Sequence, residues 1–256
     1  ANCDSVDMET EVKNYDHSVR KIQVVSKLNQ ANGKTVFRLV RTIELQPGQT
    51  QVVRQQMKVD HPILWSLKNP YLYNLISMLK DEHGETIDLV STPYGIRSIS
   101  WPVHRKDQSP SGGSKDPGTF LLNGVPVFIN GTCDYEHLFG GSHAFSHEEI
   151  QSRVKMMRQA GFNAFREAHQ PHNLLYQQLF DQQGMLFWSQ FSAHIWYDTP
   201  EFRTNFKRLL RQWIKERRNS PSVILWGLQN ESVLPKDFAE ECSAIIRQMD
   251  HCRAFF

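Results

Sequence analysis

An amide and a carboxylate stand side by side at the end of an apolar run. Residues 223–226 are all apolar, which is typical of a strand buried on both faces of a helix-covered parallel sheet. The run stops at Gly227, and Asn230 and Glu231 follow. Because ligands of α/β folds bind at the carboxyl ends of the strands, Glu231 could serve there as a general acid and Asn230 could bind a hydroxyl group. A plainer interpretation is that Glu231 only places a negative charge on the first turn of the next helix.

Other polar and aromatic residues follow three earlier apolar runs. Such a mixture at one rim suits a polyhydroxylated ligand, because sugar faces stack on aromatic rings while amides and charged groups bind hydroxyl groups. Every soluble fold of this kind has polar loops, so no single residue identifies the ligand. The residues are Asp134, Tyr135, Glu136 and His137 after the first run, Arg166, Glu167 and His169 after the second, and Gln190, His194 and Trp196 after the third.

A metal site is the main alternative for the histidines. His137, His143, His169 and His194 could converge, but no pair has HxxxH spacing on an expected helix, and their loop lacks the spacing of metal ligands. The four cysteines form no CxxC pair either. We therefore expect no metal ion and no cofactor.

Alternating strands and helices must position these residues. From residue 120 onward, apolar runs alternate with segments whose apolar residues recur every three or four positions. Ser146 and Glu149 predict a capping box at the first helix, and Thr199 with Pro200 predicts the start of the third. Four successive β-α units, the first strand at residues 125–129, indicate a parallel sheet with right-handed crossovers. A closed barrel needs eight such units, so an open four-stranded sheet and half a barrel both remain.

The first hundred residues have a period of two instead. Apolar and polar residues alternate in segments separated by turn sequences, which is typical of an antiparallel β-sandwich of roughly 100 residues. The polar stretch that follows cannot bury enough apolar surface to form a core. We expect a sandwich over residues 1–102, a linker over 103–118 and an α/β domain over 119–256.

Composition sets limits on the partners. The chain of 256 residues is 39% hydrophobic and 22% charged with a net charge of +2, which is average for a soluble globular protein. We therefore expect neither a nucleic-acid nor a membrane partner, and no apolar run approaches the roughly 18–20 residues that span a bilayer. The cysteines are too scattered for a disulfide framework, so the compartment stays open.

Five segments, in the same order, resemble glycoside hydrolase family 2, which contains β-galactosidases, β-mannosidases and β-glucuronidases. The resemblance covers nearly the whole chain and favours half a barrel over an open sheet. Residues 94–99 resemble the last strand of the family's immunoglobulin-like domain, 120–131 the start of its barrel, 156–169 its second-strand signature, 180–188 the approach to its third strand, and 219–232 its acid/base motif.

This resemblance implies an immunoglobulin-like β-sandwich followed by a (β/α)8-type barrel, truncated after about four units, and a retaining exo-β-glycosidase of the β-galactosidase-like type. Glu231 would be the general acid/base and Asn230 would hold the sugar 2-hydroxyl. For both to face the substrate, the backbone must leave strand geometry, because strand neighbours point to opposite faces. We therefore predict an irregular backbone there. The other substrate-binding residues expected are Arg166, His169, His194, Asp134, Glu136 and Trp226.

The chain departs from the family pattern at several points. Cys133 and Tyr135 stand where the family often has Asn and His, and Ser189 with Gln190 replaces a common acidic pair, so the sugar stays open. The family's nucleophile, a glutamate on a later strand, is not among these residues. We expect an inactive fragment of a retaining glycosidase that forms a homodimer through the incomplete barrel. The alternative is a non-catalytic carbohydrate-binding or scaffold protein on a degenerate barrel.

Overall fold

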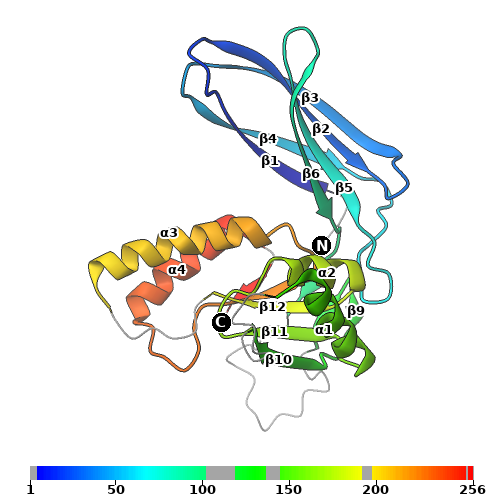
Figure 1. The fold of residues 1–256 in the computed structure, drawn as a ribbon, viewed down its shortest axis with the longest axis vertical. Helices are drawn as coiled ribbons and strands as arrows, with labels where there is room; N and C mark the ends of the chain where they lie inside the picture. The colour runs from blue at the N-terminus through cyan, green and yellow to red at the C-terminus, as the bar shows by residue number, and fades with distance from the viewer. Residues whose placement is uncertain (1–4, 102–118, 137–144, 192–197, 252, 256) are drawn as a thin grey trace, which may run out of the picture. The chain divides into compact units, whose positions relative to one another are not determined.

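Two compact units make up the protein in a computed structural model (Figure 1). The predicted linker over residues 103–118 lies outside the described residues. The first unit consists of Ala1–Leu64 with Tyr71–Ile96, and the second of Trp65–Pro70 with Arg97–Phe256. The described residues are 5–101, 119–136, 145–191, 198–251 and 253–255.

The first unit is an antiparallel β-sandwich. One sheet pairs β1 with β4, and the other has the order β3-β2-β5-β6. Alternate residues of β1 are buried, among them Val6, Met8 and Val12, as the period of two predicts. The expected sandwich is therefore confirmed. Its strands are β1 (Ser5–Lys13), β2 (Arg20–Asn29), β3 (Thr35–Leu45), β4 (Thr50–Lys58), β5 (Tyr73–Lys80) and β6 (Thr86–Tyr94).

The second unit is a parallel sheet with helices between its successive strands (Figure 1). The strand order β10-β11-β12-β13-β14 follows the chain, as it does in a (β/α)8-type barrel. The four expected β-α units are confirmed, and a fifth strand follows them. The elements are β10 (Gly131–Tyr135), α1 (His147–Gln159), β11 (Ala164–Ala168), α2 (Leu175–Gln183), β12 (Leu186–Gln190), α3 (Pro200–Arg217), β13 (Val223–Gly227), α4 (Lys236–Met249) and β14 (Ala254–Phe255).

The prediction that residues 125–129 form the first strand of this sheet was wrong. The strand is β10, and Val125 and Pro126 instead form β9 of a small antiparallel sheet with β7 (Ile99–Ser100) and β8 (Leu121–Leu122). Positive φ values at Asn123 and Gly124 close the hairpin between β8 and β9. The side chain of Phe128 is 86% exposed, so the apolar run does not enter the core.

The helix ends follow the chemistry of their sequences. Ser146 Oγ accepts a hydrogen bond from Glu149 N, and Glu149 Oε2 accepts one from Ser146 N, which confirms the capping box. Thr199 caps α3 by accepting a hydrogen bond from Phe202 N, and Pro200 follows as expected. No helix among the described residues is long and apolar enough to cross a membrane.

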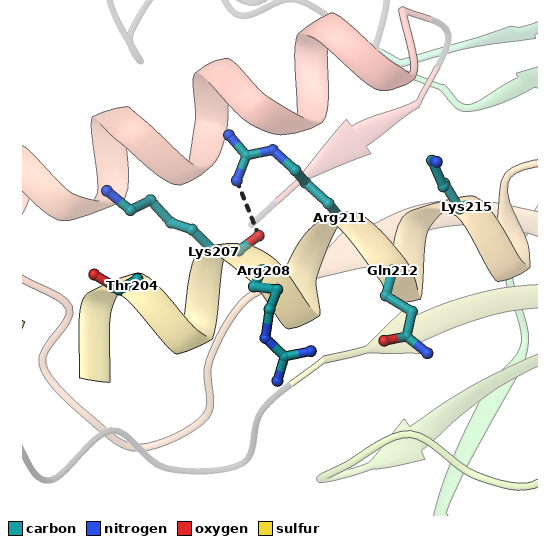
Figure 2. A pocket seen from close by; sticks show the side chains of 6 residues that line it. All are labelled: Thr204, Lys207, Arg208, Arg211, Gln212 and Lys215. Carbon is teal, nitrogen blue, oxygen red and sulfur yellow. Dashed lines mark hydrogen bonds between the residues drawn. The ribbon is translucent and has the colours of Figure 1, made fainter. Parts of the chain in front are cut away.

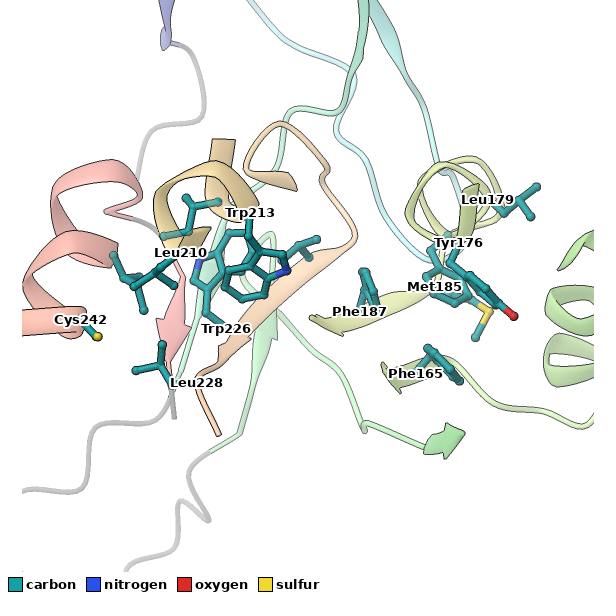
Figure 3. Close-up of a cluster of buried hydrophobic side chains, with 14 of the residues drawn as sticks. Phe165, Tyr176, Leu179, Met185, Phe187, Leu210, Trp213, Trp226, Leu228 and Cys242 are labelled. Carbon is teal, nitrogen blue, oxygen red and sulfur yellow. The ribbon is translucent and has the colours of Figure 1, made fainter. Parts of the chain in front are cut away.

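Aromatic side chains fill the space between the parallel sheet and its helices. Figure 3 shows Trp226 of β13 against Trp213 of α3, with ring centroids 4.7 Å apart. Phe165 of β11 packs against Tyr176 and Phe180 of α2 in the same cluster. Because strand residues alternate, these contacts define a helix-facing side of the sheet and leave the intervening residues on the opposite side, here called the inner face.

A short piece of the connection between β4 and β5 belongs to the second unit. Trp65 is fully buried there, and its Nε1 donates a hydrogen bond to the main-chain oxygen of Asp181 at 2.7 Å. The side chain of Asp181 accepts hydrogen bonds from Ser220 Oγ and Ser222 N, just before β13 begins. Burial raises the pKa of Asp181 to about 6. This network lies at the amino end of β13. Residues at that end of the strands of a (β/α)8 barrel contribute to stability rather than to catalysis.

Candidate functional site

Side chains on the inner face meet around Arg166. Arg166 and Trp188 are partners in the register of β11 and β12, so they lie next to each other on one face. The guanidinium carbon of Arg166 lies 4.5 Å from the centroid of the Trp188 ring. Its Nη2 donates to Gln190 Oε1 at 3.2 Å and to Asn230 Oδ1 at 2.8 Å. Residues from β11, β12 and the segment after β13 therefore converge, as the sequence predicted for Arg166 and Asn230.

Three hydrogen-bond donors in this group are buried without a protein partner among the described residues. They are Nε of Arg166, Nε1 of Trp188 and Nδ2 of Asn230. A buried donor that lacks a partner costs roughly 1–3 kcal/mol, so such groups in a folded protein usually serve a bound ligand or water. All three N–H groups offer hydrogen bonds to oxygen. The inner face thus presents three N–H donors that an oxygen atom of a bound ligand or of water would satisfy.

Gly227 leaves the space that the side chains of this group occupy. A Cβ atom at this position would lie 2.6 Å from Trp188 Nε1, and it would also overlap the side-chain amide of Gln190. Real side chains do not show such distances, so only glycine lets both neighbouring side chains occupy the inner face. The glycine that ends the apolar run in the sequence therefore has a packing reason at the site itself.

The backbone bends directly after β13. Glu231 has a φ of 45°, one of three positive φ values at non-glycine residues in the described part of the chain, and its side chain is exposed. This left-handed conformation is uncommon for a residue with a Cβ atom. It confirms the predicted irregular backbone. Glu231 is the residue that follows Asn230 of the inner group in the sequence. No metal-binding group of three or more His, Cys, Asp or Glu residues occurs among the residues that the structure describes.

His169 lies beside the inner face of β10. Its ring meets the ring of Tyr135 edge-on, with centroids 4.9 Å apart. Tyr135 is 38% exposed, so its ring is accessible to solvent. His194, also expected at the site, lies outside the described residues.

Three of the expected binding residues lie on the helix-facing side instead. Asp134 accepts a hydrogen bond from Arg153 Nε of α1 at 3.1 Å, and Glu136 accepts one from the backbone N–H of Asn173. Trp226 is fully buried, and its Nε1 donates to Asp250 Oδ2 at 2.9 Å. The physical reason is strand alternation, since successive side chains of a strand point to opposite faces of the sheet. These three are therefore not part of the proposed site.

Trp188 joins the site although the sequence did not indicate it, and Gln190, which the sequence indicated only as a polar residue after the third run, lies in the same group. Gln190 is fully buried and yet presents its carbonyl oxygen to Arg166. The available signal was the alternation of strand residues, because Trp188 pairs with Arg166 across the sheet and Gln190 follows two residues later.

Glu167 is a buried carboxylate directly behind the inner group. Its Oε1 accepts hydrogen bonds from Ser189 Oγ and Gln190 N, and its Oε2 accepts one from His172 N. Burial raises the pKa of Glu167 to about 7, while Arg217 and the three hydrogen bonds act in the opposite direction. Burial also lowers the pKa of His172 to about 4.

A surface hollow along α3 is unrelated to these residues. Figure 2 shows the side chains that line it, which all project from one helix. Arg211 donates to the main-chain oxygen of Lys207, and the Lys207 side chain pairs with Glu241 of α4. The hollow has the features of a solvated basic helix face. Its lining residues are Thr204, Lys207, Arg208, Arg211, Gln212 and Lys215.

Known proteins match most of the chain. The beta-galactosidase of Psychromonas ingrahamii is 28% identical over 187 residues, which are 70% of this chain and 17% of that protein. The beta-glucuronidase of Bacteroides fragilis is 28% identical over 234 residues, which are 86% of this chain and 32% of that protein. The chain therefore spans a third or less of the length of these relatives.

Solved structures have the same fold. A glycosyl hydrolase family 2 member from Bacteroides cellulosilyticus matches with a TM-score of 0.85 at 26% identity, over 100% of this chain and 34% of its own. The family model described as "Glycosyl hydrolases family 2" matches residues 3–97. The model "Glycosyl hydrolases family 2, TIM barrel domain" matches residues 115–255. The chain, an immunoglobulin-like domain with part of a TIM barrel, belongs to glycoside hydrolase family 2.

Proposed function

We propose that the protein is a retaining exo-β-glycosidase of the β-galactosidase-like type, in which Glu231 is the general acid/base. The observation that carries this proposal is the group of three unpartnered N–H donors, on Arg166, Trp188 and Asn230, next to the strained bend at Glu231. The donors bind sugar hydroxyl groups, and the exposed carboxyl group donates a proton to the leaving oxygen and later takes one from water. The named activities of the relatives, beta-galactosidase and beta-glucuronidase, agree with this chemistry.

Retaining hydrolysis needs a second carboxylate roughly 5–5.5 Å from the first. Glu136 and Glu167 are poor candidates, because both are buried on the helix-facing side and both accept backbone N–H bonds. We therefore propose that the 256-residue chain binds sugar but does not hydrolyse glycosides by itself. The proposed ligand class is carbohydrate, with no nucleic acid, no membrane and no cofactor.

Turnover and binding test the two halves of this proposal separately. Chromogenic β-galactoside, β-mannoside, β-glucuronide and β-glucoside are offered to the wild-type chain and to Glu231→Gln. Glu240→Gln serves as the matched control, because Glu240 is an exposed carboxylate on α4. We expect no turnover, and NMR titration with the corresponding methyl glycosides should show binding by all three proteins. Turnover lost only in Glu231→Gln would contradict the inactivity and support the acid/base role, whereas no binding to any sugar would contradict the site.

A non-catalytic carbohydrate-binding protein is the second candidate. It is favoured by the burial of Glu136 and Glu167, which leaves Glu231 as the one proposed carboxyl group of a mechanism that requires two. An extended protein that includes the later barrel strands distinguishes the candidates. Hydrolysis by that protein supports the enzyme, while sugar binding without hydrolysis supports the binding protein.

The edges of the parallel sheet support the proposed homodimer. β10 and β14 are its outer strands, each paired on one side only among the described strands. Unpaired strand edges readily pair with another chain. Light scattering after size exclusion should give about twice the mass of 29.8 kDa. A monomer across the micromolar range would contradict the dimer.

A further inference from the structure

We propose that Glu167 is a positioning residue of the sugar site, which fixes the end of β12 so that Gln190 can hold Arg166 and Asn230 in place. This inference rests on the proposed function for its consequence on sugar binding. Its structural part concerns only the position of Gln190 and stands independently.

The carboxylate of Glu167 joins two separate segments. Gln190 N donates to Oε1 at 2.7 Å and Ser189 Oγ donates at 2.5 Å, which secures the last two residues of β12. His172 N donates to Oε2 at 2.8 Å, which secures the segment that leads from β11 to α2. Glu167 is only 1% exposed, so water does not compete for these bonds. Charge-assisted bonds of this kind are about twice as strong as neutral ones.

Gln190 is consequently held from both sides of the sheet by two consecutive residues of β11. Glu167 accepts the backbone N–H of Gln190 on the helix-facing side, and Arg166 donates to its side-chain oxygen on the inner face. The same Nη2 atom of Arg166 also donates to Asn230. A shift of the Gln190 backbone would therefore change the geometry of the inner group, although Glu167 does not face that group.

Several charged groups surround Glu167 on the helix-facing side. Asp134 is its register partner on β10, and Glu136 follows two residues later on the same side. Arg153 of α1 pairs with Asp134, and Arg217 of α3 and His172 complete the set. Burial raises the pKa of Glu167 to about 7, so its charge changes near neutral pH, while His172 loses its proton well below that range.

Substitution by glutamine separates positioning from simple packing. The side chain keeps its size, but its NH₂ group must face a backbone N–H, that of Gln190 or that of His172, whichever way the amide is turned. One of the two segments therefore loses its bond. Asp181→Asn is the matched control, because Asp181 is also a buried carboxylate that accepts a serine hydroxyl and a backbone N–H, but at the opposite end of the strands.

NMR spectra of the ¹⁵N-labelled chain provide the test. We expect Glu167→Gln to move the backbone and side-chain amide signals of Gln190 and the indole signal of Trp188, and to weaken binding of methyl β-galactoside or methyl β-glucuronide about tenfold. Asp181→Asn should leave these signals in place and the affinity within about twofold. Unchanged Gln190 signals in Glu167→Gln, or equal changes in both variants, would overturn the positioning role.

Two further outcomes distinguish the positioning role of Glu167 from the proposed sugar binding. If Glu167→Gln does not fold, the wild-type chain is titrated instead, and the Gln190 amide signal should shift with a midpoint near pH 7. A Gln190 amide signal that does not move at the pH at which the Glu167 side-chain signal itself titrates would overturn the proposal. If the wild-type chain binds none of the sugars while Gln190 still responds only to Glu167→Gln, the positioning role stands and the proposed function fails.

Discussion

Arg166 donates a hydrogen bond from Nη2 to Asn230 Oδ1 at 2.8 Å, and this bond fixes which way the amide of Asn230 points. A guanidinium group can only donate, so the atom that faces it must be the oxygen. The NH₂ group of Asn230 is therefore left for a ligand, one residue before the exposed carboxyl group of Glu231. The second strand of the sheet thus orients the residue that precedes the proposed acid/base.

Arg166→Lys should abolish this arrangement while leaving the fold intact. A lysine ammonium cannot bond Gln190 and Asn230 while lying flat on the Trp188 ring, because it lacks the planar fork of guanidinium. We expect sugar affinity to fall by at least about tenfold, corresponding to roughly 1.4 kcal/mol or more. Isothermal titration calorimetry with the methyl glycoside that the wild-type chain binds best measures the effect.

Arg208→Lys is the control for that substitution. Arg208 is an exposed residue of α3 that lines the surface hollow, and its Nη2 donates to Asn205 Oδ1 of the same helix (Figure 2). The same chemical change there should leave sugar affinity unaltered. Both substitutions keep the positive charge, so equal losses of affinity in the two variants would mean that the contacts of the Arg166 guanidinium do not govern binding.

Gly227→Ala should impair the site by crowding alone. The added methyl group would collide with Trp188 and the Gln190 amide, so one of them must leave the inner face. We expect a destabilisation of roughly 1–3 kcal/mol, as for other overpacked sites, together with loss of sugar binding. Gly131→Ala is the control, since its Cβ atom would meet Ala164 Cβ at an ordinary 3.5 Å. Urea unfolding and NMR titration of both variants decide whether the free space at Gly227 matters.

Much of the fold could be predicted because local patterns and tertiary packing agree. The alternating β-α pattern, the capping box at Ser146 and the bend at Glu231 all appear as expected. The position of β10 could not be read in the same way, since the apolar run at 125–129 looks like a buried strand but forms a hairpin with β8 and leaves Phe128 exposed. Hydrophobicity alone does not determine which apolar run becomes buried in the core.

The site was predicted less completely for a related reason. A run such as 223–226 is apolar at every position, so the side that Trp226 faces cannot be deduced from alternation. Asp134 and Glu136 were placed correctly at a strand end but on the wrong side of the sheet. The inclusion of Trp65–Pro70 in the second unit depends on contacts such as Trp65 with Asp181, which are far apart in the sequence and leave no local signal.

Glu231→Gly should stabilise the protein even as it removes the proposed acid/base. The left-handed φ of 45° costs a residue with a Cβ atom roughly 1–2 kcal/mol, while glycine costs roughly 0.5–1 kcal/mol through the unfolded chain. We expect a net gain of about 1 kcal/mol in the free energy of unfolding. Urea unfolding of both proteins at one pH provides the comparison.

Val233→Gly is its matched control. Val233 is 84% exposed and is not among the described residues with positive φ, so glycine brings only the entropy penalty there. This variant should lose roughly 0.5–1 kcal/mol. A loss of similar size in Glu231→Gly would mean that the positive φ of Glu231 carries no strain.

The buried carboxyl group of Glu167 should make stability depend on pH in a defined direction. Its pKa in the folded protein is raised from 4.5 to about 7, so between these values the unfolded chain loses the proton while the folded protein still holds it. The contribution of Glu167 to the unfolding free energy of the wild type therefore falls as pH rises from 4.5 to 7, and it is constant above pH 7. Glu167→Gln has no such proton, and both proteins keep Asp181 and His172.

The difference in unfolding free energy between wild type and Glu167→Gln should therefore shrink from pH 4.5 to pH 7. The full shift corresponds to roughly 3 kcal/mol, at about 1.4 kcal/mol for each pH unit. Urea unfolding of the two proteins at half-unit intervals of pH measures the difference directly. A constant difference would show that the pKa of Glu167 is not raised, because its three hydrogen bonds and Arg217 would then at least offset the effect of burial.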